Sequence, residues 1–579
     1  MSCKHDTTQA SDATLTSLAD HARSPAFRDE TVALLLELCR IDTTTHPDVS
    51  MMAQHEAACF KLIRQALTDA AAILNGQFTR QPINPKIADH PFYSKPAYTI
   101  VPPTNTLLSA EQTYRDRANM LFTTGDAAQW GLAVNAHVDV VHPYIPPRVE
   151  GSTVYGRGSC DDKGPLVSII GALRLVAEYL RKNKLKLSKP LTAMFVIEEE
   201  MGGNGSLSAA MDRTLRKRYD TIAVLECCGS QIHPGNRGAV WYKVEGDVPG
   251  GRALEAAAFV IEQMEREGRA VKSESRHELF PHRPVQTCHG ILGSFGQHPS
   301  RICGEIAFDI LMDHASRPRD EAFSTRLGDV LESGLAEYIG LYGDKTKVAD
   351  PITGKPKVDH HYDLQTTDRG WRVTVHGATG HMGSILENDG AITKAAAMIR
   401  ALIYSRASLE QSAGCAIAPR LADKTDANHL LMEGGQGFLP THAMADIQRR
   451  LAGAAQRGLD AYLRLMGSTA ENLRVTFEKL HNAAFAGPRD SPAMVDALRS
   501  AHEAGVPIPE QSQVKGWDVS CDSRIFACEY SDLTVLTMGP GLLRHAHADD
   551  EQISIDELMR FTELMARFIL KQCGTVCAG

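Results

Sequence analysis

Histidines and carboxylates follow several apolar stretches of the chain, at spacings that suit metal binding. NAHVDVV places His137 and Asp139 two residues apart, so on a strand both side chains face the same side of the sheet. YGRGSCDDKG carries Asp161 and Asp162 on a turn, LTAMFVIEEE ends in three carboxylates, and TIAVLECC carries Glu226. A buried carboxylate is costly unless it is paired or bound to a cation. Each pattern alone is weak, but together they indicate a pair of divalent cations.

The elements that must position these side chains are short apolar strands bounded by turn residues. They are expected at 131–141, 191–200, 221–228 and 533–541, with a helix over 164–183 between the first two. Buried strands that alternate with helices predict a mostly parallel sheet covered on both faces. Sites in such sheets form outside the carboxyl ends of the strands. The polar residues gather at those ends: His137, Asp139, Glu198 to Glu200, Glu226, and His545 and His547 in a late loop.

Taken in order, these residues resemble the motifs of a known family, the di-zinc exopeptidases and deacylases. The family includes acetylornithine deacetylase, succinyl-diaminopimelate desuccinylase, aminoacylase, glutamate carboxypeptidase, carnosinase and bacterial dipeptidases. The matching motifs are HxD at 137–139, GRGxxDxKG at 156–164, EExGxxGS from Glu199, Glu226 before Arg237-Gly238, and AHxxxE at 546–551. The resemblance covers nearly the whole chain. It implies an α/β fold: a mostly parallel sheet sandwiched by helices, the zinc exopeptidase-like catalytic domain, with an inserted α+β lid domain.

The resemblance also implies a role for each residue of the site. Asp161 resembles the carboxylate that bridges two metal ions, with His137 and Glu226 completing one site and Glu200 and His547 the other. Glu199 resembles the general base and Asp139 the carboxylate that orients His137. The cofactors implied are two Zn²⁺ ions, for which Co²⁺ or Mn²⁺ could substitute. In this family the bridging Asp precedes a cis bond, so the Asp161–Asp162 bond is expected to be cis.

Two further residues resemble groups that bind the substrate. HGATGHMGS (376–384) resembles a lid segment whose histidine stabilises the oxyanion, which makes His381 a catalytic and substrate-binding candidate. CDSRIFA (521–527) resembles a loop whose arginine region lines the pocket, so Arg524 is a candidate for carboxylate binding. The lid departs from the family at Gly437, where an Asn is usual, and at Gln448, where an Arg is usual.

An internal repeat occupies the middle of the chain. Segment 324–343 aligns without gaps to 448–467, and the matches include Gly334 with Gly458. Upstream of 324–343 and of 448–467, strand-like and Ala-rich segments also match one another in the same order. This favours a duplicated module over two similar amphipathic helices. We therefore predict a catalytic domain of residues 1–235 and 486–579 and an inserted lid of residues 236–485, with copies at 236–345 and 368–485. Only the second copy carries the histidine, which predicts a monomer with an internal pseudo-dimeric lid.

Composition excludes several classes of protein. The 579 residues are 43% hydrophobic and 23% charged with a net charge of −9, which argues against nucleic acid or an anionic membrane as partner. No apolar run approaches the roughly 20 residues of a spanning helix. The polar first residues, MSCKHDTTQASD, and 13 cysteines without a disulfide framework predict a cytoplasmic protein.

The expected reaction is hydrolysis of an amide bond in a small N-acyl amino acid or short peptide, by attack of zinc-bound hydroxide. Within the family, Glu at the position of Glu226 is typical of deacylases and aminoacylases, whereas a duplicated lid resembles that of a monomeric bacterial dipeptidase. Deacylation is slightly favoured and a monomeric dipeptidase is the alternative. An inactive metal-binding relative is the alternative of a different class, which the intact ligands and base disfavour.

Overall fold

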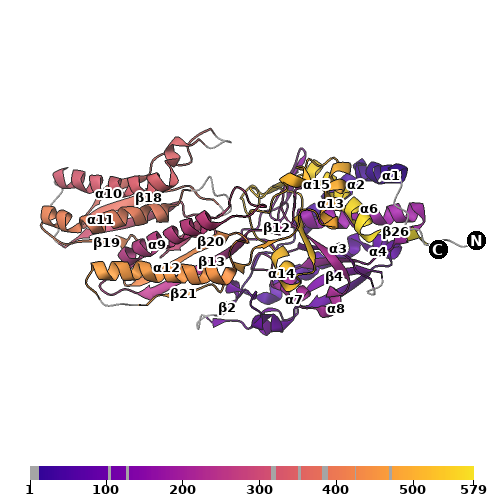
Figure 1. The fold of residues 1–579 in the computed structure, drawn as a ribbon, viewed down its shortest axis with the longest axis horizontal. Coiled ribbons are helices and arrows are strands. Elements are labelled where there is room, and N and C mark those ends of the chain that lie inside the picture. Colours follow the sequence, from indigo (N-terminus) through magenta and orange to yellow (C-terminus); the bar gives the residue numbers. More distant parts are fainter. Residues whose placement is uncertain are drawn as a thin grey trace, which may run out of the picture. The chain divides into compact units, whose positions relative to one another are not determined.

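In the computed structural model of this chain, the described residues are 12–578 apart from 102–105, 126–128, 314–320, 350–353, 381, 383–388, 424–425 and 469–471. The chain divides into two compact units (Figure 1). Unit 1 consists of Met1–Arg237 with Asn482–Gly579, and unit 2 is Gly238–His481. The roles assigned from the sequence to 1–235 with 486–579 and to 236–485, a catalytic domain and a lid, stay predictions.

Unit 1 is built on a seven-stranded sheet in the order β1-β4-β9-β5-β10-β24-β11. Its four middle strands are parallel and correspond to the four strands expected from the apolar runs. The other three pair antiparallel, so the sheet is mixed. The strands are β1 (Gln77–Pro82), β4 (Ala118–Thr124), β9 (Leu191–Val196), β5 (Gly131–His137), β10 (Tyr219–Leu225), β24 (Thr534–Met538) and β11 (Ile232–His233).

The register of the parallel strands brings their carboxyl ends level. His137, the last residue of β5, pairs with Val196 of β9, and Asn135 pairs with Val224 of β10. β5 and β9 are buried at every position, as expected for strands with covered faces. Residues that follow these strands therefore emerge side by side at one edge of the sheet.

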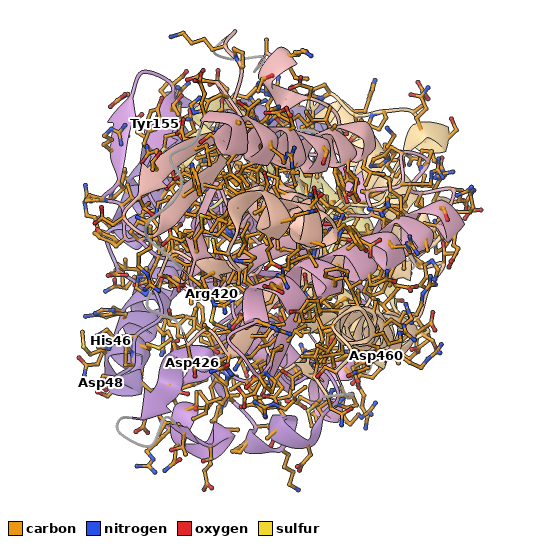
Figure 2. All side chains as sticks on the ribbon, turned by 90° about the vertical axis from the view of Figure 1, so that its left-hand side faces the viewer. His46, Asp48, Tyr155, Arg420, Asp426 and Asp460 are labelled. Atoms are coloured by element: carbon orange, nitrogen blue, oxygen red, sulfur yellow. The ribbon has the colours of Figure 1, made fainter. Side chains whose placement is uncertain are left out.

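Helices α6 (Lys163–Asn183) and α15 (Ile555–Cys573) pack against each other and against β5. Helices α7 (Asn204–Ala210) and α14 (Ser523–Glu529) contact β4 and β24 respectively. In α3, Asp48 caps the N-terminus by accepting from Ser50 N–H, and His46 lies beside it (Figure 2). The remaining helices are α1 (Asp12–Ala22), α2 (Pro25–Cys39), α3 (Val49–Ala66), α4 (Thr68–Leu74), α5 (Ala110–Thr113), α8 (Arg213–Arg216) and α13 (Pro492–Glu503).

Short strands complete unit 1. They pair as β2 (Ile100–Val101) with β3 (Thr106–Leu107), β12 (Gly235–Asn236) with β23 (Phe485–Ala486), β26 (Thr575–Cys577) with β8 (Leu185–Leu187), and β25 (Gln552–Ser554) with β7 (Thr153–Tyr155), which also pairs with β6 (Arg148–Glu150). Among the described helices of the whole chain, none is long and apolar enough to cross a membrane.

In its described residues, unit 2 contains two sheets and four long helices. One sheet has the order β15-β14-β20-β13-β21 and the other β17-β18-β16-β19. Their strands are β13 (Gly238–Asp247), β14 (Thr287–Leu292), β15 (Phe295–Gly296), β16 (Glu305–Met312), β17 (Tyr362–Thr367), β18 (Gly370–His376), β19 (Ile417–Leu421), β20 (His429–Phe438) and β21 (Arg474–Thr476).

The helices of unit 2 pack in pairs. Helix α9 (Ala253–Glu274) packs on α12 (Met444–Leu465), and α10 (Glu321–Tyr342) packs on α11 (Ala391–Ala413), as Figure 1 shows. Each predicted copy thus contains strand, helix, strand, strand and helix: β13, α9, β14, β16 and α10 in the first, β18, α11, β19, β20 and α12 in the second. Each sheet pairs a strand of one copy with a strand of the other, β13 with β20 and β18 with β16.

Candidate metal centre

Four of the expected ligands form a connected chain at the carboxyl edge of the unit 1 sheet. His137 Nε2 lies 3.2 Å from Asp161 Oδ1, and Asp161 Oδ2 lies 3.3 Å from His547 Nε2. His547 Nε2 in turn lies 3.1 Å from Glu200 Oε1. Asp161 is therefore the residue between the two imidazoles, with one oxygen toward each.

The fifth expected ligand, Glu226, lies in the same cluster. Ligand atoms of His137, Glu199 and Glu226 lie within 4.8 Å of one another, and so do those of Asp161, Glu200 and His547. Glu226 follows the end of β10, level with the end of β5. The structure thus brings together every residue that the sequence suggested as a ligand, in two groups on either side of Asp161.

Three buried atoms in this cluster show that it suits metal ions. His137 Nε2, Asp161 Oδ1 and Glu226 Oε1 have no hydrogen-bond partner among the described residues, although the first two are 3.2 Å apart. Donor atoms of a tetrahedral zinc site are about 3.3 Å apart, given bonds of about 2.0–2.1 Å. Buried polar atoms without hydrogen-bond partners are costly unless something else binds them. Nitrogen and carboxylate oxygen are the donors of catalytic zinc sites, so these residues fit such ions.

The negative charge of the cluster also favours the binding of cations. Seven carboxylates gather around two imidazoles: Asp139, Asp161, Asp162, Glu199, Glu200, Glu226 and Asp522. Burial and the charge of Asp522 hold the pKa of Glu199 well above its ordinary value. Burial and the charge of Glu199 do the same to the pKa of Glu226. Two divalent cations would remove most of this repulsion.

Asp139 fixes the backbone that carries the carboxylates at the end of β9. Its Oδ1 accepts from Glu199 N–H at 3.2 Å and its Oδ2 from Glu200 N–H at 3.1 Å. His137 Nδ1 lies 3.0 Å from the backbone carbonyl of Asp139 and 3.5 Å from its carboxylate. The described contacts of the Asp139 carboxylate are therefore mainly with the two glutamates, while its carbonyl holds the ring of His137.

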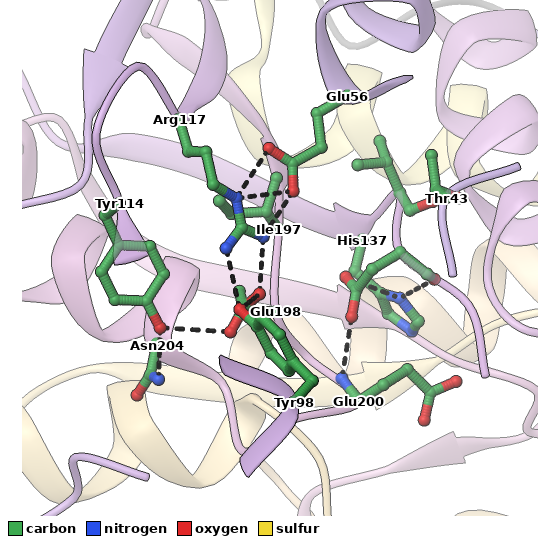
Figure 3. Close-up of polar contacts among 12 residues, drawn as sticks. Thr43, Glu56, Tyr98, Tyr114, Arg117, His137, Ile197, Glu198, Glu200 and Asn204 are labelled. Carbon is green, nitrogen blue, oxygen red and sulfur yellow. Dashed lines mark hydrogen bonds and ion pairs between the residues drawn. The ribbon is translucent and has the colours of Figure 1, made fainter. Parts of the chain in front are cut away.

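A buried ion network holds Glu198, the first of the three successive glutamates (Figure 3). Glu198 has a positive φ of 68°, a conformation that non-glycine residues rarely adopt. Its carboxylate accepts from Arg117 Nη2 at 2.6 Å, Tyr98 OH at 2.5 Å and Tyr114 OH at 3.1 Å. Arg117 also binds Glu56 through two nitrogens. This network anchors the strand end that presents Glu199 and Glu200.

Glu551 anchors the turn that carries Asp161. Its Oε1 accepts from the N–H groups of Gly158, Cys160 and Asp161 at 2.9, 3.0 and 3.0 Å. Its Oε2 pairs with the buried Arg157. The Asp161–Asp162 bond is cis, as the resemblance implied, and Asp162 accepts from His137 N–H at 3.0 Å. One carboxylate thus organises the whole segment 157–161.

The two substrate-binding candidates differ in what the structure says of them. His381 lies outside the described residues, so its position is not assigned. Arg524 is buried, donates to the carbonyls of Gly202 and Cys521 at 2.8 and 3.1 Å, and lies 3.6 Å from Asp522. Its assignment as a carboxylate-binding group stays a prediction.

Sequence reasoning gave no role to Glu551, Asp522, Arg117 or Glu56. Glu551 is the last residue of the AHxxxE motif, and that motif is the signal available for it in the sequence. Arg117 lies 81 residues from Glu198 in sequence and sits in no motif. Its partnership depends on the antiparallel pairing of β4 with β9, which the apolar patterns did not reveal.

A comparison with protein families gives a match to the family described as Peptidase family M20/M25/M40, over residues 133–571. Curated relatives align over short stretches. A peptidase M20 domain-containing protein of Schizosaccharomyces pombe is 31% identical over 103 residues, 18% of this chain and 24% of that protein. A probable carboxypeptidase of Arthroderma gypseum is 29% identical over 139 residues, 22% of this chain and 29% of that protein. The alignments thus span less than a third of either relative.

Solved structures resemble the chain over nearly its whole length. Human carnosine dipeptidase 1 has a TM-score of 0.52 at 13% identity, covering 96% of this chain and 99% of that chain. The di-peptidase Dug1p of Saccharomyces cerevisiae has a TM-score of 0.52 at 14% identity, covering 96% of this chain and 98% of that chain. At these identities the likeness is one of fold.

Proposed function

The chain belongs to peptidase family M20/M25/M40, and we propose that it hydrolyses the amide bond of a small N-acyl amino acid or short peptide at a centre of two divalent metal ions. The observation that carries this proposal is the burial of His137 Nε2, Asp161 Oδ1 and Glu226 Oε1 in one cluster of metal-ligating residues, without hydrogen-bond partners among the described residues. His137, Asp161 and Glu226 would hold one ion, and Asp161, Glu200 and His547 the other.

When bound, two such ions would polarise the scissile carbonyl and lower the pKa of a water molecule. The chain supplies the remaining steps. Glu199 would take the proton of the attacking water on its carboxylate and return it to the leaving amine. Asp139 keeps that carboxylate in place, since it binds the backbone N–H groups of both Glu199 and Glu200. His381 and Arg524 are proposed, from the sequence resemblance alone, to stabilise the oxyanion and to bind the substrate's carboxylate.

Between the two substrate classes we favour N-acyl amino acids, because residue 226 is a glutamate. A dipeptidase is the second candidate, which the overall likeness to two dipeptidase structures supports at the level of fold. The two differ in what lies on the amino side of the scissile bond, an acyl group or an α-ammonium.

The test is a panel of dipeptides and of N-acetyl and N-succinyl amino acids, assayed with protein loaded with Zn²⁺, Co²⁺ or Mn²⁺. We expect turnover of N-acyl amino acids above that of dipeptides, lost on chelation and restored by metal. Faster hydrolysis of dipeptides would select the second candidate. Protein that binds two ions and turns over no amide would contradict both and indicate an inactive relative.

We further propose that unit 2 is a lid built from two copies of one module. Gly334 and Gly458, matched in the sequence repeat, occupy corresponding helix crossings: a Cβ on Gly334 would lie 2.6 Å from Met398 Cα of α11, and one on Gly458 2.5 Å from Val260 Cα of α9. The matched Tyr338 and Tyr462 each donate a hydrogen bond of 2.6 Å to a carboxylate. Similar helix surfaces alone would not place these matched residues in the same contacts.

A further inference from the structure

A second cluster of metal-ligating side chains lies in unit 2, among His360, Asp363 and His376. His360 Nε2 is 3.2 Å from Asp363 Oδ1, and His376 Nε2 is 2.9 Å from Asp363 Oδ2. One ligand atom from each residue lies within 4.8 Å of the other two. We propose that these three residues bind a further transition-metal ion of the Zn²⁺ class. The proposal does not depend on the reaction assigned to unit 1.

The topology of the second sheet creates this cluster. His376 is the last residue of β18, Asp363 lies on the neighbouring edge strand β17, and Glu305 begins β16 directly opposite His376. His376 Nδ1 lies 3.6 Å from Glu305 Oε2, so both ring nitrogens face a carboxylate. The ring of His360 stands edge-on to that of His376, with centroids 4.7 Å apart at 70°.

The backbone beneath the cluster is held in place by a buried lysine. Lys394 Nζ donates to the carbonyl of His376 at 2.6 Å, pairs with Asp389 at 2.8 Å and lies 3.1 Å from His361 Nδ1. Because an ammonium can only donate, His361 Nδ1 is an acceptor, and its Nε2 then donates to Asp344 at 3.0 Å. His361 thus has both ring nitrogens engaged by Lys394 and Asp344, outside the cluster, so it is not included among the proposed ligands.

The donor set defines the class of ion. Two imidazoles and one carboxylate suit Zn²⁺, Co²⁺, Ni²⁺ or Cu²⁺, whereas Mg²⁺ and Ca²⁺ prefer oxygen ligands throughout. Donor separations of 2.9 and 3.2 Å are close to the edge of about 3.3 Å in a tetrahedral zinc site. The side chain of His376 is 23% exposed and those of His360 and Asp363 about half exposed, so solvent can reach an ion there. An ion would tie the edge strand β17 to β18.

Without an ion, the same contacts would be exposed His–Asp pairs, which contribute little to stability. A metal site and simple His–Asp pairs differ in whether added metal protects the imidazoles from chemical modification. The surface pair of His429 and Asp247, 3.0 Å apart, supplies a control because it contains one histidine and one carboxylate only.

The experiment measures carbethoxylation of each histidine by diethyl pyrocarbonate at pH 8 in the full chain, with peptides identified by mass spectrometry. Micromolar ZnCl₂ should slow modification of His360 and His376 at least about tenfold and leave His429 unaffected, and millimolar MgCl₂ should protect neither. Asp363→Asn should abolish the protection and remove one equivalent of bound zinc, with hydrolytic activity unchanged. Equal modification with and without zinc, or full protection in Asp363→Asn, would overturn the proposal. Because each histidine is read separately, ions bound in unit 1 do not affect the outcome.

Discussion

Three successive glutamates at the end of β9 have three different surroundings. Glu198 is enclosed by Arg117, Tyr98 and Tyr114, whereas Glu200 lies beside His547. Glu199 belongs to the group with His137 and Glu226. Strand β9 ends at Val196, before these residues, and the positive φ of Glu198 turns the backbone just before the other two. Adjacent residues of one type can therefore perform separate tasks.

The first prediction separates Glu199 from Glu200. Glu199→Gln should lower kcat by about 10²–10⁴ while two metal ions stay bound, because the amide cannot accept the proton of the attacking water. Glu200→Gln, the matched control, should lose metal, because a neutral amide is a poor ligand in place of a carboxylate. Metal analysis and kcat are measured on both. Retention of more than about a tenth of wild-type kcat in Glu199→Gln would refute its role as base, and loss of metal would mean that the two assignments are exchanged.

A second prediction concerns Glu551, which is not an expected metal ligand but accepts from the backbone N–H of one, Asp161. Glu551→Gln cannot accept from three N–H groups and pair with Arg157 at once, so it leaves a buried guanidinium without its counter-ion. Such a loss costs about 3–5 kcal/mol. Because Asp161 is displaced, metal affinity should fall about 10–100-fold. The measurements are the free energy of unfolding and a zinc titration.

The neighbouring Asp550→Asn is the matched control for Glu551→Gln, because Asp550 is exposed and the chemical change is the same. It should change neither stability nor metal affinity. Equal behaviour of the two variants would show that the carboxylate of Glu551 has no part in holding the site.

At the scale of elements, the network around Arg117 links α3, β4 and the end of β9, and it predicts a pH dependence of stability. Burial raises the pKa of Glu56 to about 7, against 4.5 as its ordinary value, with Arg117 opposing the shift. The folded chain therefore binds this proton more tightly than the unfolded chain. The contribution of the protonated Glu56 to stability is fully present below about pH 4.5 and is lost as the pH rises through about 7.

The measurement compares the free energy of unfolding of the wild type with that of Glu56→Gln, both with chelator so that metal binding adds no pH dependence. The stability of the wild type relative to the variant should fall by up to about 3 kcal/mol between pH 4.5 and pH 7.5, since each unit of pKa shift is worth about 1.4 kcal/mol. A difference that is flat over this range, or that grows with pH, would show that Glu56 stays ionised in the folded chain.

The helix crossings of unit 2 give a prediction for the repeat. Gly334→Ala and Gly458→Ala should each destabilise their helix pair by about 1–3 kcal/mol, because a Cβ at either position would overlap the backbone of the facing helix. Gly328→Ala in the same helix α10 meets nothing within 4 Å and should instead stabilise it by about 0.5–1 kcal/mol. Hydrogen exchange of peptides from the four long helices reports each pair. Unequal costs at Gly334 and Gly458 would argue against equivalent copies.

The sequence predicted the parallel strands of unit 1, whose burial is visible in local composition, but not β4, although six of its seven residues are buried. The four parallel strands of unit 1 are apolar runs, and the residues after them gather because parallel strands end at one edge. β1 was missed because this edge strand, QFTRQP, has no buried position and no alternating pattern. The Arg117 and Glu551 contacts join segments 81 and more than 390 residues apart, so no local spacing reveals them. His360 and His376 meet only through the β17–β18 hairpin.

At the scale of the whole molecule, the repeat predicts that one chain functions alone. The first strand of each copy pairs with the last strand of the other within unit 2, β13 with β20 and β18 with β16, so each copy already has the other as its neighbour. A second chain is then not needed to supply an equivalent surface. Light scattering over a range of concentrations should give a mass near 63.1 kDa. Mixing a His381→Ala chain with a Glu199→Gln chain should restore no activity, since complementation requires a site shared between chains. A stable species of about twice that mass, or activity regained on mixing, would contradict the prediction and indicate that subunits of a dimer complete each other's sites.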